Sequence, residues 1–361
     1  MFSVFDRWYK RKFSDPDAVM LLLLLLAVSL FLLFWGSMLA PVMVSVALAY
    51  LLDWPVTKME NLNWSRTASS GVVTILFIGI MVLVSIGLLP VVWNQSINLI
   101  NEAPEIWSKT QQWIVSLPEH YPNLVKGEQI EKMLVGVDER IVALGENLIS
   151  ASFSSLFGLG ALLIYAILVP LMMFFMLKDK PLLLQHVSRF LPQQRRLILQ
   201  VGQEMNGQII NYIRGKVIEI LIVGTVSVIT FLVMDLRYAL LLGILVGFSV
   251  LIPYIGAAVI TIPIAAVALF QWGVSPEFWY IMVVYAIIQA LDGNLLVPIL
   301  FSEAVNLHPL YIIIAVLFFG GLWGFWGVFF AIPLATLVSA LFRAWSSPVL
   351  TEKAPLQISE E

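Results

Sequence analysis

The sequence contains no cysteine and few charged residues. Without thiols it can form no disulfide, no thiolate nucleophile and no cysteine-based metal site. Only 12% of the 361 residues are charged, whereas soluble domains carry roughly a quarter. The 20 basic and 23 acidic residues nearly balance, so the chain lacks the basic excess of nucleic-acid-binding proteins. These absences exclude a nucleic-acid function and redox chemistry based on cysteine.

Motifs that mark common enzyme classes are also missing. Gly215 and Lys216 lack the upstream glycine of a Walker A loop, and neither HExxH nor GxSxG occurs. The histidines His120, His186 and His308 lie far apart in the sequence. We therefore expect neither enzymatic activity nor a bound cofactor or metal.

Apolar residues, by contrast, are abundant. They make up 60% of the chain, and its mean hydropathy is +0.93, which is typical of a polytopic integral membrane protein. We expect an all-α fold with about eight membrane-entering segments, plus a small extramembrane helical domain. Four basic residues precede the first apolar block, which predicts a cytoplasmic N-terminus; they are Arg7, Lys10, Arg11 and Lys12.

Charge and hydropathy divide the chain into six parts. Acidic residues outnumber basic ones between residues 93 and 150, which suits a periplasmic domain, whereas basic residues dominate 178–215, which suits the cytoplasm. Both segments carry the apolar periodicity of amphipathic helices. The expected parts are N-terminal membrane segments (1–92), the periplasmic domain (93–150), a span (151–177), the cytoplasmic amphipathic helix (178–215), a C-terminal membrane core (216–343) and a disordered cytoplasmic tail (344–361).

Two apolar runs, 239–270 and 310–342, are too long for a single crossing and must be interrupted. Pro253, Tyr254 and Gly256 predict the break in the first run, because proline cannot complete the helical hydrogen bonds and glycine permits unusual dihedral angles. The second run contains the segment GGLWGFWG, whose small residues favour close helix packing. Each run forms either a re-entrant hairpin or a pair of full spans.

The segment 289–309 is the most unusual part of the chain, because Asp292 stands within an apolar stretch. A carboxylate in lipid is costly unless it is paired, protonated or facing water. Gly293 and Pro298 predict a helix break here, and we expect this break and the one at Pro253, Tyr254 and Gly256 to line a shared cavity. Asp292 either faces a water-accessible cavity and serves in transport or coupling, or caps the half-helix after Gly293; the two roles are compatible.

Other polar residues accompany Asp292. Gln289 and Asn294 either complete a polar cluster around it or bind freed backbone carbonyls, and we favour the structural role. The simpler interpretation of Glu219 is an ion pair with Lys216 or Arg214. The alternative is that Glu219 carries protons. Where the chain leaves the membrane, interfacial hydrogen bonding is favoured over a gate for three residues, namely Glu303, Asn306 and His308.

Five long phrases carry a family resemblance: LAPVMVSVALAYLLDWP, NYIRGK, LVGFSVLIPYIGA, ALDGNLLVPILFSEAVNLHPL and FGGLWGFWGVFFAIPLATL. Together they resemble the autoinducer-2 exporter family of membrane permeases over essentially the whole chain. The resemblance implies a multi-pass protein of the bacterial inner membrane. Members of that family have been assigned signal-molecule export or sodium/proton antiport, but the family name assigns no substrate to this chain.

Two functional hypotheses follow. The first is a secondary transporter that exports a small solute or ion, coupled to a proton or sodium gradient, with Asp292 alternating between protonated and charged forms. The second is a membrane scaffold that recruits partners through residues 93–150. The overlong broken runs and the deep acid favour transport. Expected partners are the lipid bilayer, the solute or ion, and further copies of the chain in a homo-oligomer.

Overall fold

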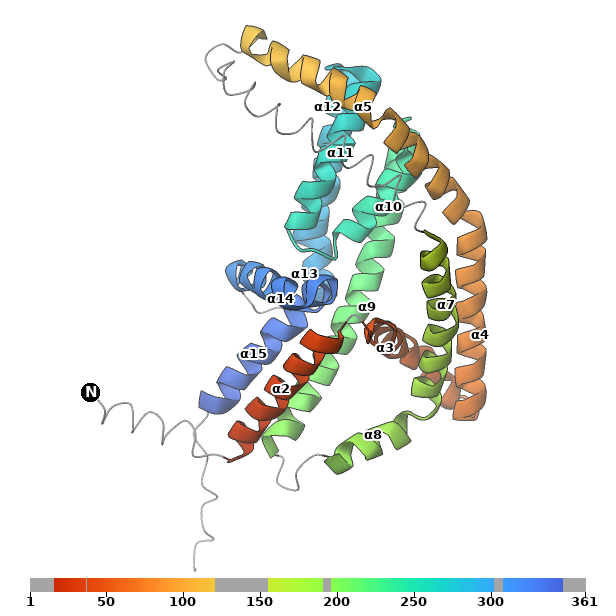
Figure 1. The fold of residues 1–361 in the computed structure, drawn as a ribbon, viewed down its shortest axis with the longest axis vertical. Coiled ribbons are helices and arrows are strands. Elements are labelled where there is room, and N and C mark those ends of the chain that lie inside the picture. Colours follow the sequence, from red (N-terminus) through yellow and green to blue (C-terminus); the bar gives the residue numbers. More distant parts are fainter. Residues whose placement is uncertain (1–15, 37, 121–154, 191–195, 302–307, 347–361) are drawn as a thin grey trace, which may run out of the picture. The chain divides into compact units, whose positions relative to one another are not determined.

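The computed structural model describes residues 16–36, 38–120, 155–190, 196–301 and 308–346, and no strand occurs among them (Figure 1). The predicted all-α class is confirmed for this part of the chain. Within the described ranges, six helical stretches are long and apolar enough to cross a membrane, so the predicted count of about eight is not confirmed. They are Ala40–Glu60, Arg66–Ser116, Val201–Val233, Ile255–Trp272, Pro276–Phe301 and Pro309–Phe329.

These helices belong to two compact units, which are described separately. The larger unit comprises residues 37–184 and 210–302, and the smaller unit comprises residues 1–36, 185–209 and 303–361. Glu303 and Asn306, the candidate gate residues, lie outside the described residues, as do residues 121–150 of the predicted periplasmic domain (93–150).

Three helices of the larger unit form one bundle: α3 (Ala40–Glu60), α4 (Arg66–Gly87) and α7 (Ser155–Lys178). Figure 1 shows α4 and α7 side by side. The bundle core contains Val56, Val73 and Met173. The hydroxyl of Ser45 donates to the carbonyl of Val169 on α7 at 3.2 Å. Ser69 and Ser70 are fully buried on α4; such small residues let membrane helices approach closely.

The helix α4 passes almost directly into α5 (Leu89–His120), and together they form the long curved arm of Figure 1. Residues 93–120 of the predicted extramembrane part therefore continue a membrane helix. The arm packs against α10 (Ala239–Ser249) and α11 (Ile255–Trp272). Glu102 pairs with Arg237 at 2.8 Å, and the Gln95 side chain accepts from the Leu241 amide at 2.9 Å.

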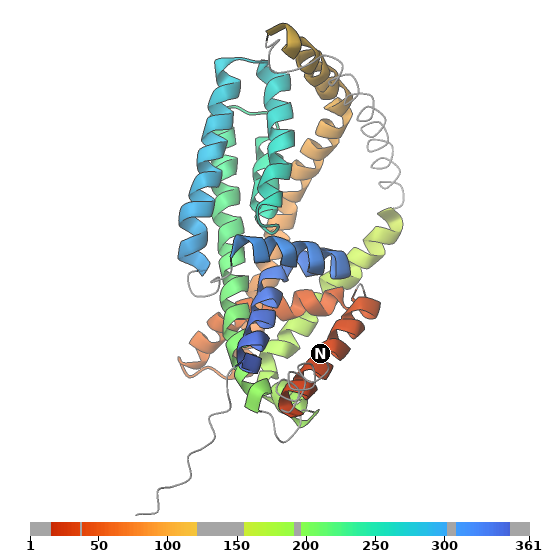
Figure 2. The same cartoon turned by 90° about the vertical axis from the view of Figure 1, so that its left-hand side faces the viewer.

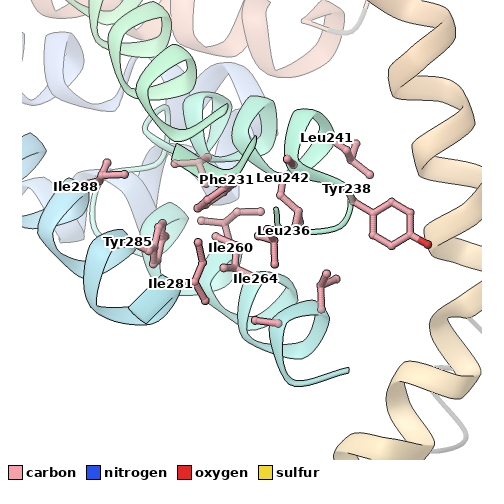
Figure 3. Packing of buried hydrophobic residues seen from close by; sticks show 14 of the residues in the cluster. Phe231, Leu236, Tyr238, Leu241, Leu242, Ile260, Ile264, Ile281, Tyr285 and Ile288 are labelled. Carbon is pink, nitrogen blue, oxygen red and sulfur yellow. The ribbon is translucent and has the colours of Figure 1, made fainter. Parts of the chain in front are cut away.

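The main core of the larger unit lies among α5, α9 (Arg196–Val233), α10, α11 and α12 (Pro276–Leu291). Figure 3 shows Phe231, Leu242, Ile264 and Ile281 meeting there. Glycine backbone forms the contact between α9 and α10, because a Cβ on Gly247 would come within 2.9 Å of the Gly224 Cα. Since lipid supplies little hydrophobic drive between helices, such close contacts carry much of the packing.

A tight turn separates α10 from α11 at residues 250–254, and the two helices pack against each other. We call residues 250–256 the hairpin tip. Tyr254 has a φ of 62°, and a Cβ on Gly256 would overlap the Ser249 carbonyl oxygen. Only glycine can therefore occupy position 256 without moving the end of α10.

In the smaller unit, α14 (Pro309–Phe329) packs against α15 (Ala331–Ser346) and contacts α2 (Pro16–Trp35) (Figure 2). Gly324 has φ 57° and ψ −134°, so the helical path is interrupted there. A Cβ on Gly327 would overlap the Phe319 carbonyl oxygen. The glycines of GGLWGFWG thus shape a turn within the segment, in addition to the close packing that the sequence predicts.

The helices α8 (Lys180–Phe190) and α9 account for the predicted amphipathic segment 178–215. The structure differs from the prediction in one respect: the second half of that segment and the following span form one 38-residue helix, α9. Val201 and Met205, four residues apart on α9, are buried, as expected for the apolar face of an amphipathic helix.

Candidate functional site

Two charged residues on α9 form a buried ion pair within the larger unit. Lys216 Nζ lies 2.8 Å from Glu219 Oε2, and their side chains are 5% and 2% exposed. Residues three apart share one face of a helix, so their sequence spacing brings them together. Glu219 therefore forms the ion pair with Lys216 that was one of the two pairings suggested by the sequence.

Lys216 also holds two other parts of the larger unit. Its Nζ donates to the carbonyl of Val250, the C-cap residue that follows α10, at 2.7 Å. It lies 5.3 Å from the centre of the Phe301 ring, which belongs to α13 (Val297–Phe301). Gly215 leaves room for that ring, since a Cβ there would lie 2.5 Å from its edge. The ammonium therefore joins α9 to the hairpin tip and to α13.

Asp292 supplies a third charge at this site. It lies close enough to Lys216 and to Glu219 to interact electrostatically with both. The side chain is half-buried, and its Oδ1 is buried without a hydrogen-bond partner. Asp292 is thus a carboxylate that the surrounding protein satisfies only in part.

The backbone around Asp292 differs from the expected break. Asp292–Leu296 is a π-helical turn between α12 and α13, and the Val297 amide donates to the Asp292 carbonyl. The helix therefore continues through Gly293 and Pro298, because a wider turn accommodates the extra residue. Asp292 has right-handed helical dihedral angles at the end of α12 and does not cap a separate half-helix. Such π-turns occur frequently at functional sites.

Gln289 and Asn294 flank Asp292 in different ways. The Asn294 amide donates to the Ala290 carbonyl at 2.8 Å, the structural role favoured from the sequence. Gln289 lies beside the Tyr285 hydroxyl, which in turn donates to the Ala257 carbonyl at 3.2 Å. The Nε2 of Gln289 is buried without a hydrogen-bond partner. Polar groups therefore recur along α12 from Tyr285 to Asp292.

Two other candidate residues, Tyr254 and His308, have different roles. Tyr254 is 57% exposed at the hairpin tip, so this tip reaches the charged site through the backbone of Val250 rather than through the side chain of Tyr254. His308 accepts from the Leu310 amide at 3.2 Å and caps α14.

Sequence reasoning named Lys216 only as a partner of Glu219 and missed Tyr212 and Phe301. Tyr212 is 1% exposed, and its ring centre lies 5.9 Å from that of Phe301. The available signal was the spacing of Tyr212, Lys216 and Glu219, which places all three on one face of a helix. Nothing in the sequence pointed to Phe301, because its contact with α9 depends on the tertiary fold.

Comparison with known proteins decides the family. The profile described as AI-2E family transporter matches residues 20–347. The chain belongs to this family. The resemblance found in the sequence is confirmed, and it extends over the helices that hold Lys216, Glu219 and Asp292.

Several known proteins are similar to this chain along most of their length. The chain is 50% identical over 345 residues to "Putative permease PerM" of Escherichia coli (strain K12), covering 96% of this chain and 98% of that protein. It is 29% identical to "Putative transport protein YueF" and 26% identical to "Putative transport protein YrrI", both of Bacillus subtilis (strain 168). Those matches cover 86% and 90% of this chain, and 85% and 94% of the relatives.

Proposed function

We propose that this protein is a secondary transporter that moves a small solute or ion outward across the bacterial inner membrane, driven by a proton or sodium gradient. Membership of a transporter family supports transport in general. The observation that carries the mechanism is the buried pair of Lys216 and Glu219, which lies within electrostatic range of Asp292.

The charges at this site do not balance. One ammonium faces two carboxylates, so the fully ionised cluster has one excess negative charge. Because burying an uncompensated charge costs several kcal/mol, the cluster favours taking up one proton or one monovalent cation. Asp292 is the natural acceptor, since Glu219 forms an ion pair with Lys216 at 2.8 Å and Asp292 forms none among the described residues.

The helix lengths support a transporter with a discontinuous segment. The 11 residues of α10 rise about 16 Å, which is short of the about 30 Å of a hydrocarbon core. We infer that α10 and α11 form a re-entrant hairpin whose tip ends within the membrane. Transporters commonly bind ions and substrates where such helices are interrupted. The basic residues before the first apolar block support a cytoplasmic N-terminus. We also propose that the protein works as a homo-oligomer.

A flux assay tests the role of Asp292. The purified protein is placed in liposomes with an enclosed pH indicator, and proton movement is followed after a proton or sodium gradient is imposed. We expect Asp292→Asn to reduce gradient-driven movement to the level of protein-free liposomes. The matched control is Asp179→Asn, because Asp179 contacts Lys178 at 3.9 Å between α7 and α8, outside the charged site.

The assay also separates transport from a scaffold function. If the protein is instead a scaffold that works through residues 93–150, we expect no flux in the native protein, in Asp292→Asn or in Asp179→Asn. Deleting residues 93–150 should then remove the proteins that co-purify with it. Normal gradient-driven flux in a folded Asp292→Asn protein rules out coupling through this carboxylate.

A further inference from the structure

The C-terminal end of α7 is held by side chains from the neighbouring helices. Pro181 has no amide hydrogen, so it cannot bond to the Leu177 carbonyl four residues earlier. Arg66 Nε on α4 donates to that carbonyl instead, at 2.7 Å. Lys180, the first residue of α8, contacts Asp53 on α3 at 2.7 Å. The chain therefore leaves α7 at a level that α3 and α4 determine.

Two tryptophans indicate that this level is a membrane boundary. Trp54 follows Asp53 in α3, and Trp64 lies in the connection between α3 and α4, just before Arg66. Their side chains are 57% and 50% exposed, and tryptophan is enriched where lipid meets water. Both α3 and α4 contain candidate spans, and α7 packs against them. The helix α8 therefore begins where the chain leaves the lipid.

An exposed apolar stripe runs along α8. Leu183, Leu184 and Val187 lie on one side of this helix and are 44%, 59% and 59% exposed. Gln185 and Arg189 lie on the opposite side, because each residue turns the helix by about 100°. No acidic residue occurs in its sequence, KPLLLQHVSRF. Helices with one apolar face and a basic polar face lie in the interface of a bilayer.

We propose that α8 is an interfacial helix that binds the leaflet at the C-terminal end of α7, with its apolar stripe in the lipid and Arg189 among anionic headgroups. In this position the stripe is removed from water, which is favourable for apolar side chains. Arg189 is exposed, and basic residues close to an anionic lipid surface are attracted to it. Lys180 contributes less to this attraction, because Asp53 already neutralises it.

The size and the position of the stripe favour lipid over a protein partner. Only Asp179 separates α8 from α7 (Figure 1), and the 11 residues of α8 extend about 16 Å. The whole stripe therefore stays close to the membrane boundary. Three partly exposed side chains also supply far less than the about 800 Å² that each partner buries in a stable protein interface.

The native absence of cysteine allows single probes to be attached to α8. Leu184→Cys introduces a thiol in the stripe, and Gln185→Cys, the matched control, introduces one on the opposite side, where the native side chain is also exposed. Each thiol is labelled with the fluorophore NBD, and the full chain is placed in liposomes of equal parts phosphatidylcholine and phosphatidylglycerol. Two quenchers are compared: iodide in the water on both sides, and lipid with a doxyl group on its acyl chain.

The two probes should respond in opposite ways. We expect doxyl lipid to quench the probe at position 184 and iodide to quench the probe at position 185, because an interfacial helix buries its apolar face about 5–10 Å deep. Adding Leu183→Gln/Val187→Gln to the Leu184→Cys protein should restore iodide quenching, since it removes the rest of the stripe. Both replaced side chains are exposed, so the variant should fold, which SDS titration checks.

The part assigned to Arg189 is tested through lipid charge. Quenching of the probe at position 184 by doxyl phosphatidylglycerol is compared with quenching by an equal amount of doxyl phosphatidylcholine. One basic residue near the surface gives a preference of up to about five-fold for the anionic lipid, which Arg189→Gln should abolish. The matched control is Lys109→Gln, because Lys109 on α5 is similarly accessible, at 50% exposure, and should leave the preference unchanged.

Three results contradict the proposal. If iodide quenches both probes equally and doxyl lipid quenches neither, α8 lies in water. If the probe at position 184 is protected from both quenchers, protein covers the stripe, and a second copy of the chain or another protein replaces lipid as the occupant. If the preference for anionic lipid persists in Arg189→Gln, headgroups are not bound by this residue. None of these outcomes depends on transport, so the proposed function is tested separately.

Discussion

The larger unit contains two ionic clusters that differ in how completely their charges are satisfied. In the bundle of α3, α4 and α7, Arg66 Nη1 contacts Glu60 at 2.8 Å and Nη2 contacts Asp53 at 3.1 Å. Its Nε donates to the Leu177 carbonyl at 2.7 Å, and Lys180 contacts the other oxygen of Asp53 at 2.7 Å. Two bases and two acids balance one another.

The cluster around Lys216 has the opposite character. It contains one base and two acids, of which Lys216 and Glu219 are nearly inaccessible to solvent and Asp292 is half-buried. One oxygen of Asp292 has no hydrogen-bond partner. Binding a further ion would not stabilise the Arg66 cluster, because its charges already balance. Binding a proton or a cation would stabilise the Lys216 cluster, because it has one excess negative charge. The comparison separates an ionic tie that holds helices together from a site prepared to exchange a proton or cation.

The largest effect on stability is expected from Lys216→Met. It leaves Glu219 buried at 2% exposure with no cation, and removing one partner of a buried pair costs about 3–5 kcal/mol in soluble proteins. We expect a loss of that order in the free energy of unfolding, measured by SDS titration in mixed micelles.

The matched control is the pair Lys216→Met/Glu219→Gln, which removes both charges while keeping similar side-chain volumes. Most of the lost stability should return, because an apolar or neutral replacement of a buried pair is often nearly neutral. If the double variant is no more stable than Lys216→Met alone, burial of the lone carboxylate is not the cause of the loss.

A smaller effect is expected from Arg66→Ala. This change breaks two ion pairs and one bond to a backbone carbonyl, but Asp53 and Glu60 are 19% and 29% exposed, so water can replace part of the lost interaction. Hydrogen bonds to charged groups contribute about 1.5–3 kcal/mol, and we expect a loss in this range by the same titration.

Arg66→Lys sharpens this test. Lysine keeps the charge but cannot reproduce the planar fork that contacts two carboxylates and a carbonyl at once. Its stability should therefore fall between those of the native protein and Arg66→Ala. Equal stability of the native protein and Arg66→Lys would show that charge alone holds this junction.

The sequence predicted part of this comparison. The lone carboxylate of Asp292, the interruption near Pro253 and the pairing of Glu219 follow from local rules, because each concerns a charge or a proline within an apolar stretch. That Lys216 also binds the hairpin tip and lies over the Phe301 ring could not be predicted. The bond to the Val250 carbonyl joins residues 34 positions apart, and Phe301 is farther still, so both contacts depend on how the helices pack.

The π-turn at Asp292–Leu296 is a second feature that local sequence rules could not predict. Gly293 and Pro298 disfavour a regular helix, and the sequence therefore suggested a break. A single wide turn also removes the conflict, and it keeps the helix continuous from Pro276 to Phe301. Local preferences identify the disturbed position, whereas the surrounding helices decide between a break and a π-turn.

The smallest effect is expected from Lys180→Ala. Lys180 is 41% exposed and contacts an Asp53 side chain that Arg66 also neutralises, and exposed pairs contribute about 0.2–1 kcal/mol. The loss should disappear in about 1 M salt, where the screening length falls to about 3 Å. The loss in Lys216→Met should persist there, because salt does not reach a buried pair. Equal salt sensitivity of the two variants would mean that water reaches Lys216 in the folded protein, and the contrast between the two clusters would then be one of charge balance alone.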